Sequence, residues 1–175
     1  IGISQSSLTR KVASGRIERL APGLYKHPKA SISGEELDFA VACARFKPDA
    51  VVGGMTALFH YGLIEQVPQR IWVMVPYERR VHDPLYRCIR TKTPFDKGVD
   101  VRKNYRITSF ERTIVEAFRY ASKIGLRTAF HAAPTAIKEK RTTLQKNYRE
   151  AKILGLERFI QRHWEALTPE GQAAA

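Results

Sequence analysis

Apolar and polar positions near the start of the chain recur with helical spacing. Leu8 and Val12 stand at i and i+4, so both fall on one face of a helix. Ser4 precedes this stretch and is placed to cap the free amides of the first turn. Gly15 follows the stretch and predicts where the helix ends.

The residues after this helix predict a short hairpin. Residues 16–20 alternate polar with apolar side chains, as in a strand with one solvated face. Ala21-Pro22-Gly23 has the composition of a turn, and residues 24–26 follow as a second short strand. A short helix followed at once by a basic hairpin is the ending of a winged helix-turn-helix, in which the helix lies in the major groove of DNA.

The polar side of the expected helix carries side chains that hydrogen-bond base edges and phosphates. We expect Gln5, Ser6, Thr9 and Arg10 to read bases, Lys11, Arg16, Arg19 and Lys26 to bind phosphates, and Ser4 to lie in the same interface. Residues 1–30 hold six basic residues and one acidic residue, a net charge of +5. A merely solvated helix face and a hairpin that is basic for solubility would give the same pattern, so this alternative stays open.

A helix-turn-helix needs an earlier helix to support the reading helix. Only residues 1–3 precede the expected helix, and residue 1 is not methionine. We therefore expect an N-terminal piece of about 20 to 40 residues, one or two helices and a turn, to be absent from this sequence.

Residues 31–175 predict a mixed α/β domain. Ser33 and Glu36 have the spacing of a capping box, and Leu37, Ala40, Val41 and Ala44 then recur as a helix face that we expect to face the core. The expected strands are 50–52, the apolar and therefore buried 70–76, the half-solvated 86–90 and the basic 99–107. Gly53-Gly54 is expected to be a tight turn into a helix that ends at Gly62.

The last third is expected to be helical. Thr108 and Glu111 have capping-box spacing before a helix with Ile114, Ala117, Phe118 and Ala121 on one face. A helix over 128–133 should be interrupted at Pro134. Residues 143–154 and 156–167 predict a helical hairpin broken at Gly155, and residues 168–175 a frayed tail. The expected inward stripe of that hairpin is Leu156, Phe159, Ile160, His163, Trp164 and Leu167. The expected fold is thus α+β: a truncated winged helix-turn-helix over 1–30 and a domain over 31–175 with a small sheet and a C-terminal helical hairpin.

The charge of the chain narrows the class of partner. A formal net charge of +13 and a sequence pI near 10.0 make a polyanion the expected partner, and nucleic acid is favoured over a membrane surface. No apolar run approaches the roughly 20 residues that cross a bilayer, and no long basic amphipathic helix is evident. A possible second basic surface consists of Arg79, Arg80, Arg102 and Lys103. For Arg79 and Arg80, a solvated arginine pair without a ligand is an equally good interpretation.

The sequence does not favour an enzyme. Its candidate metal-binding carboxylates are Asp83, Asp96, Asp100, Glu111 and Glu116, and none forms the close pair with a following Glu-x-Lys that metal-dependent nucleases use. Arg112 and Glu116 stand at i and i+4, so we expect a helix-surface ion pair.

Other reactive residue types also have plain explanations. His60 beside Tyr61 is expected to pack at a helix end, and no nucleophile elbow appears. Cys43 and Cys88 are expected to be free thiols of a cytoplasmic protein. No metal and no cofactor is expected.

Four stretches, taken in order, resemble the AbiEi antitoxin family, the transcriptional regulators of bacterial abortive-infection toxin–antitoxin systems. They are 2–25, which includes the Leu-Thr-Arg-Lys-Val and Leu-Ala-Pro-Gly-Leu-Tyr runs, then 52–63, 71–76 and 105–118. The resemblance covers nearly the whole chain, and the order of the stretches is its specific part. This sequence departs from the family at its start and at Glu116, where an aspartate is expected.

The resemblance implies a winged helix-turn-helix that binds repeats in its own promoter and represses the operon, as a monomer in solution or a dimer on DNA. It also implies a C-terminal domain that counteracts a nucleotidyltransferase-like toxin, with or without direct contact. The sequence thus leaves two hypotheses: a DNA-binding autorepressor and antitoxin of a type IV system, and a metal-dependent nuclease or nucleotide-handling enzyme with a basic nucleic-acid-binding surface.

Overall fold

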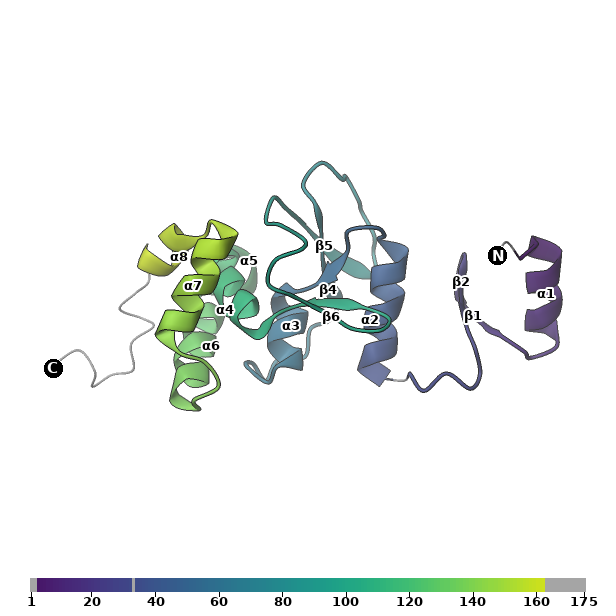
Figure 1. Cartoon of the computed structure of the whole chain (residues 1–175), viewed down its shortest axis with the longest axis horizontal. Coiled ribbons are helices and arrows are strands. Elements are labelled where there is room, and N and C mark those ends of the chain that lie inside the picture. The colour runs from purple at the N-terminus through teal and green to yellow at the C-terminus, as the bar shows by residue number, and fades with distance from the viewer. Residues whose placement is uncertain (1–2, 33, 163–175) are drawn as a thin grey trace, which may run out of the picture.

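The computed structural model describes residues 3–32 and 34–162 and has an α+β fold (Figure 1). In this part of the chain the helices are α1 (Gln5–Ala13), α2 (Gly34–Arg45), α3 (Gly54–His60), α4 (Phe110–Arg119), α5 (Ala121–Ile124), α6 (Leu126–Lys138), α7 (Leu144–Leu154) and α8 (Glu157–Arg162). The strands are β1 (Glu18–Ala21), β2 (Leu24–Lys26), β3 (Val51–Val52), β4 (Ile71–Pro76), β5 (Tyr86–Thr91), β6 (Val99–Val101) and β7 (Arg106–Thr108).

The first helix and hairpin form as the sequence predicts. Ser4 caps α1 by accepting a hydrogen bond from the Ser7 amide at 3.3 Å, and Gly15 follows the helix with φ +67°. β1 and β2 pair antiparallel across Pro22 and Gly23. Gly23 has φ +74°, the conformation that glycine supplies after proline in a type II turn.

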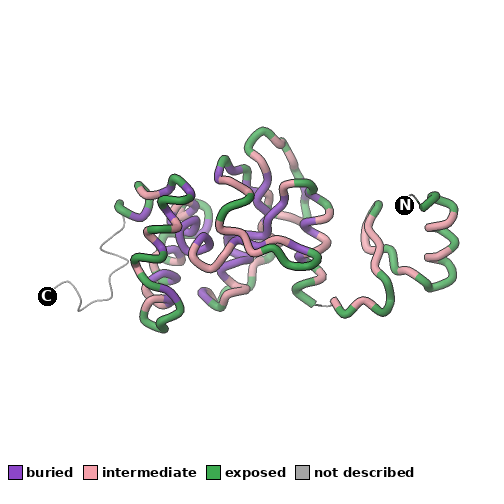
Figure 2. Tube along the Cα trace, in the orientation of Figure 1, coloured by how far each residue is buried: buried purple, intermediate pink, exposed green. Residues whose placement is uncertain are grey.

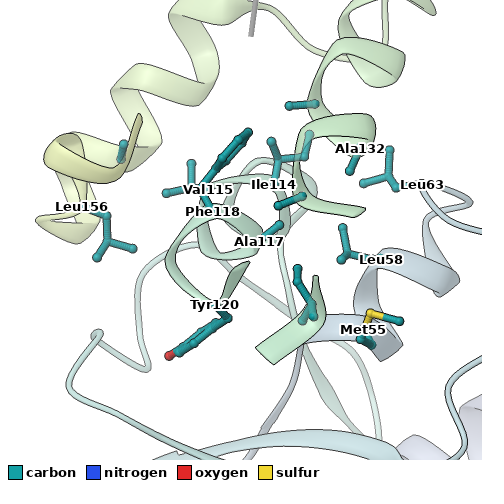
Figure 3. Packing of buried hydrophobic residues seen from close by; sticks show 14 of the residues in the cluster. Met55, Leu58, Leu63, Ile114, Val115, Ala117, Phe118, Tyr120, Ala132 and Leu156 are labelled. Carbon is teal, nitrogen blue, oxygen red and sulfur yellow. The ribbon is translucent and has the colours of Figure 1, made fainter. Parts of the chain in front are cut away.

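The main sheet is mixed, with strand order β5-β4-β3-β7-β6. β4 lies inside it, parallel to β5 and antiparallel to β3, which confirms the buried strand expected there. Alternate residues of β4 serve opposite faces: Val73 packs on the side of α2, and Met74 on the side of α3 and α4. Figure 3 shows the second core, where α3, α4 and α6 bring Leu58, Ile114 and Ala132 together.

The face of α2 that packs on the sheet differs from the prediction. Its buried residues are Phe39, Ala42 and Cys43, which pack with Val52, Val73 and Ile107 of the sheet. The predicted core face of Leu37, Ala40, Val41 and Ala44 is only half-buried, because it looks toward the β1-β2 hairpin. α2 is therefore apolar on two sides, and the helical period alone selected the wrong one. The expected cap at Ser33 lies outside the described residues.

Arg112 and Glu116 of α4 form the expected ion pair, but the expected surface position is wrong, because both side chains are in the core. Arg112 is 0% exposed and Glu116 is 1% exposed, with Nη2 and Oε1 3.2 Å apart. All seven residues from Arg112 to Phe118 are buried, since α3, α6, α7 and α8 surround the helix together with the sheet. The cap is Ser109, one residue later than the Thr108-Glu111 box predicts.

The C-terminal helices follow the prediction in part. α6 continues through Pro134, so the expected interruption is wrong; alanines on both sides of the proline hold the helix in the core. Gly155 ends α7 in the left-handed conformation, as expected. Leu156 and Ile160 are buried, whereas Phe159 is 36% exposed and does not belong to the inward stripe. The remaining stripe positions, His163, Trp164 and Leu167, lie outside the described residues. Among the described helices, none combines the length and apolar character needed to cross a bilayer.

Candidate nucleic-acid interface

Helix α1 presents its polar side to solvent. Gln5, Ser6, Thr9 and Arg10 are all exposed, and Ser4 is exposed at the cap. Leu8, Val12 and Lys11 are half-buried, so the covered side is the apolar one that the sequence indicates. Figure 1 shows α1 at the end of the molecule, with the hairpin between it and α2. The face therefore has the access that major-groove contacts require.

The same exposure has a structural cost. No residue of α1 is buried, and the first buried residue of the described chain is Phe39. Figure 2 shows the first helix and the hairpin in the colours of exposed and intermediate residues. A helix of nine residues depends on packing rather than on its own propensity. Among the described residues, α1 is supported by its capping hydrogen bonds, by the bonds from the Arg16 and Ile17 amides to the Lys11 carbonyl, and by its half-buried side.

The hairpin adds cations beside the helix. Arg16 and Arg19 are exposed, and Lys26 is half-buried and lies opposite Glu18 in the strand register. Within the described residues, none of the ion pairs uses a cation from this helix and hairpin, and Glu18 is the one acidic residue in these elements. Arg10 and Lys11 stand in the last turn of α1, where their charge also complements the helix dipole. This interaction explains their position without a ligand.

A groove separates the hairpin from α2. Its apolar wall consists of Leu24 and Tyr25 from the hairpin and the half-buried face of α2, and it has a volume of 660 Å³. Four lysines from three separate segments of the sequence line it: Lys26, Lys29, Lys47 and Lys103. Glu36 is the one carboxylate among its lining residues. The packing of the hairpin on α2 thus joins the cations of the first thirty residues to those of the sheet domain.

The possible second basic surface divides into residues with different roles. The Arg79 side chain is held by the protein itself, because its Nη1 donates hydrogen bonds to the carbonyl oxygens of Phe46 at 2.5 Å and Lys47 at 2.7 Å. Arg80 is exposed. Arg102 lies 3.7 Å from Asp100, and Lys103 belongs to the groove beside the hairpin. The sequence missed the part that Lys29 and Lys47 play, because only the packing of α2 brings these lysines together.

Four of the five candidate catalytic carboxylates, all except Asp96, accept hydrogen bonds from structural partners. Asp83 accepts from Arg45 Nε at 2.6 Å and from the Leu85 amide at 2.9 Å. Burial would raise the pKa of Asp83, but these two donors outweigh it and the pKa is lowered. Asp100 accepts from the Tyr61 hydroxyl at 3.3 Å.

The other carboxylates follow the same pattern. Glu111 accepts from the Thr142 hydroxyl at 3.1 Å, and Glu116 pairs with Arg112. Across 3–32 and 34–162, no three His, Cys, Asp or Glu side chains are placed to hold a metal ion.

The remaining reactive residues have structural partners. His60 Nδ1 lies 2.8 Å from Glu35 Oε2 and joins α3 to α2, while its ring packs edge-on against Phe39 and Tyr61. Cys43 and Cys88 are free, as expected, and burial raises the pKa of both thiols.

Models of known protein families give no match to this chain, and a search of curated protein sequences gives no significant match either.

Proposed function

We propose that the protein is a DNA-binding transcriptional autorepressor that acts as an antitoxin, with α1 as the reading helix and the β1-β2 hairpin as the wing of a winged helix-turn-helix. In this proposal Gln5 and Arg10 contact base edges, and Arg16, Arg19 and Lys26 contact phosphates. The cytoplasmic location and the nucleotidyltransferase-like toxin belong to the same proposal and derive from the family resemblance.

One observation carries the proposal: the exposed side of α1 is the side that holds Gln5, Ser6, Thr9 and Arg10. A short helix normally buries its apolar side and leaves a charged, mixed surface. Here the exposed side has amide, hydroxyl and guanidinium groups and no carboxylate, and an adjacent hairpin continues the positive charge. These are the groups that read the major groove and bind the flanking backbone.

The groove beside the hairpin supports a larger footprint than the helix alone. Lys26 from the hairpin and Lys103 from the sheet domain line the same groove, so the positive charge of the hairpin continues onto the sheet domain. The remainder of the domain is assigned a regulatory role, in keeping with the structural partners of Asp83, Asp100, Glu111 and Glu116.

Footprinting of the protein on the promoter upstream of its own gene tests the proposal. We expect protection of repeated sites, with the neighbouring open reading frame encoding the toxin. Absence of protection at every concentration that gives a soluble protein would contradict it.

Gln5→Ala supplies the specificity test. Loss of a bidentate base contact should cost about 1–3 kcal/mol against the preferred base and leave affinity for non-cognate duplex unchanged. Competition between cognate and shuffled duplexes measures this. Lys152→Ala is the control, because Lys152 is exposed on α7, outside the proposed interface.

A further inference from the structure

A second basic groove lies where α3, β4, β5, α5 and the loop after α3 meet. Trp72 of β4 and Arg87 of β5 lie side by side in the parallel register. Lys123 of α5 and the loop residues Gln66 and Arg70 complete the rim, with Met55 and Ile124 as the apolar floor. The groove has a volume of 410 Å³, within the range of small-ligand sites, which is about 300–1,000 Å³.

The charges around this groove are of one sign. Arg70, Arg87 and Lys123 line it, and no carboxylate does. In the described part of the chain none of these three side chains takes part in an ion pair. Cations that converge from three elements without a counter-charge raise the local concentration of an anion.

Trp72 supplies an aromatic surface within the same groove. Its backbone is fixed, because its amide donates to Thr56 Oγ1 at 2.8 Å and its carbonyl accepts from the Gly53 amide at 3.1 Å. The ring packs closely on Gly54, where an added Cβ would lie 2.6 Å from Cε3. The Arg87 guanidinium lies 5.9 Å from the ring centroid, in the range of a cation–π contact.

We propose that this groove binds a nucleotide, either free or as one unit of a single strand. The phosphate is held by Arg87, Lys123 and Arg70, and the base stacks against the Trp72–Arg87 pair. Gln66 and Gln69 stand at the rim, where their amides donate to and accept from the edge of a base.

The combination of groups distinguishes a nucleotide from a simple anion. Inorganic phosphate needs the cations alone, whereas the half-buried Trp72 and the apolar floor add a surface that suits a flat ring. Base–aromatic stacking tolerates every base, because each has a π-face, so binding is expected to show modest base preference.

Intrinsic fluorescence of Trp72 provides the assay. The chain has two tryptophans, so the Trp164→Phe variant of the full chain makes Trp72 the single reporter. The probes are AMP, GMP, CMP and UMP, with inorganic phosphate, adenosine and a hexamer of deoxyadenylate for comparison. Equilibrium dialysis with radiolabelled AMP measures the same binding without relying on the fluorescence change.

Arg87→Ala and Lys123→Ala are the test variants, because both side chains are exposed and their loss leaves the core intact. Each should raise the Kd for nucleotide by about tenfold, or about 1.4 kcal/mol. Lys152→Ala, an exposed lysine on α7, should leave the Kd unchanged. Thermal melts of all three variants verify that they fold.

The comparison of probes decides the ligand. Saturable binding of monophosphates that exceeds that of phosphate and adenosine supports a free nucleotide, and much tighter binding of the hexamer with the same sensitivity to Arg87→Ala supports a single strand. Three results overturn the proposal: no binding of any nucleotide or hexamer, phosphate binding as tight as AMP, or nucleotide binding that neither variant weakens.

This inference is independent of the proposed function. The groove belongs to α3, β4, β5, α5 and the loop after α3, and it shares no residue with α1 or the hairpin. Arg87→Ala should leave duplex binding through α1 unchanged, so failure of one proposal does not count against the other.

Discussion

Replacing Arg112 with methionine should remove the central polar contact of the core. The Arg112 guanidinium donates to the carbonyl oxygens of Pro94 and Lys97, both at 2.6 Å, and to Glu116 Oε1 at 3.2 Å. The side chain is 0% exposed, so water does not replace these bonds in the variant. Arg112 therefore joins the loop after β5 to α4 by hydrogen bonds and also neutralises the buried Glu116 carboxylate.

The size of the effect follows from what the variant leaves behind. Removing one partner of a buried ion pair costs about 3–5 kcal/mol, because the other charge remains buried without compensation. Glu116 Oε2 already has no hydrogen-bond partner among the described residues, so the carboxylate has little other support. For a chain of this length that loss lowers the Tm by roughly 6–20 °C.

Urea denaturation of the wild type, Arg112→Met and a matched control measures the free energy of unfolding. The control is Arg127→Met, an exposed arginine on α6, which should stay within about 0.5 kcal/mol of the wild type. The double variant Arg112→Met/Glu116→Leu should be more stable than Arg112→Met, because it removes the orphaned charge. A loss below 1 kcal/mol for Arg112→Met would refute the reasoning about the pair.

Two further predictions concern the surroundings of this pair. Burial raises the pKa of Glu150 above its usual value of 4.5, while Arg112 opposes the rise and Glu116 adds to it. The folded protein therefore binds this proton more tightly than the unfolded chain does. Stability falls as the pH rises from the unfolded pKa of Glu150 through its raised folded pKa. Glu150→Gln should therefore flatten this fall and raise stability at pH 7, which urea titrations from pH 4 to pH 8 measure; an equal fall in both proteins would contradict it. Gly98→Ala should lower the Tm more than Gly155→Ala does in thermal melts. Both glycines have positive φ, but only at Gly98 would an added Cβ lie 2.0 Å from Glu150 Oε1 and 3.0 Å from Arg112 Cβ. An equal fall in Tm for the two variants would show that the clash at Gly98 is relieved.

The spacing of apolar residues, together with capping residues, glycines and prolines, predicted most of the helices and strands. Ser4, Gly15 and the Pro22-Gly23 pair mark the helix and hairpin at the start: the Ser4 side chain caps the first turn, and Gly15 and Gly23 take the positive φ that favours glycine. The apolar density of β4 indicated a strand buried on both faces, because such strands cannot alternate. These features depend on short-range geometry, which the sequence carries directly.

The errors come from packing between distant segments. α2 has two apolar sides, and its period does not say which one meets the sheet and which meets the hairpin. Arg112 and Glu116 have the spacing of a surface pair, and only the enclosure of α4 by other helices places them in the core. The groove beside the hairpin could not be predicted for the same reason, since Lys26 and Lys103 line it only because the hairpin lies next to the second apolar side of α2.

The salt dependence of duplex binding tests the reading-helix account most directly. The logarithm of the binding constant should fall linearly with the logarithm of salt concentration, by about 0.9 for each phosphate neutralised. Arg19→Ala should weaken binding to every duplex and reduce the magnitude of that slope by about 1, while Lys152→Ala leaves it unchanged. Duplex that fails to bind, or an Arg19→Ala slope equal to that of the wild type, would contradict the account.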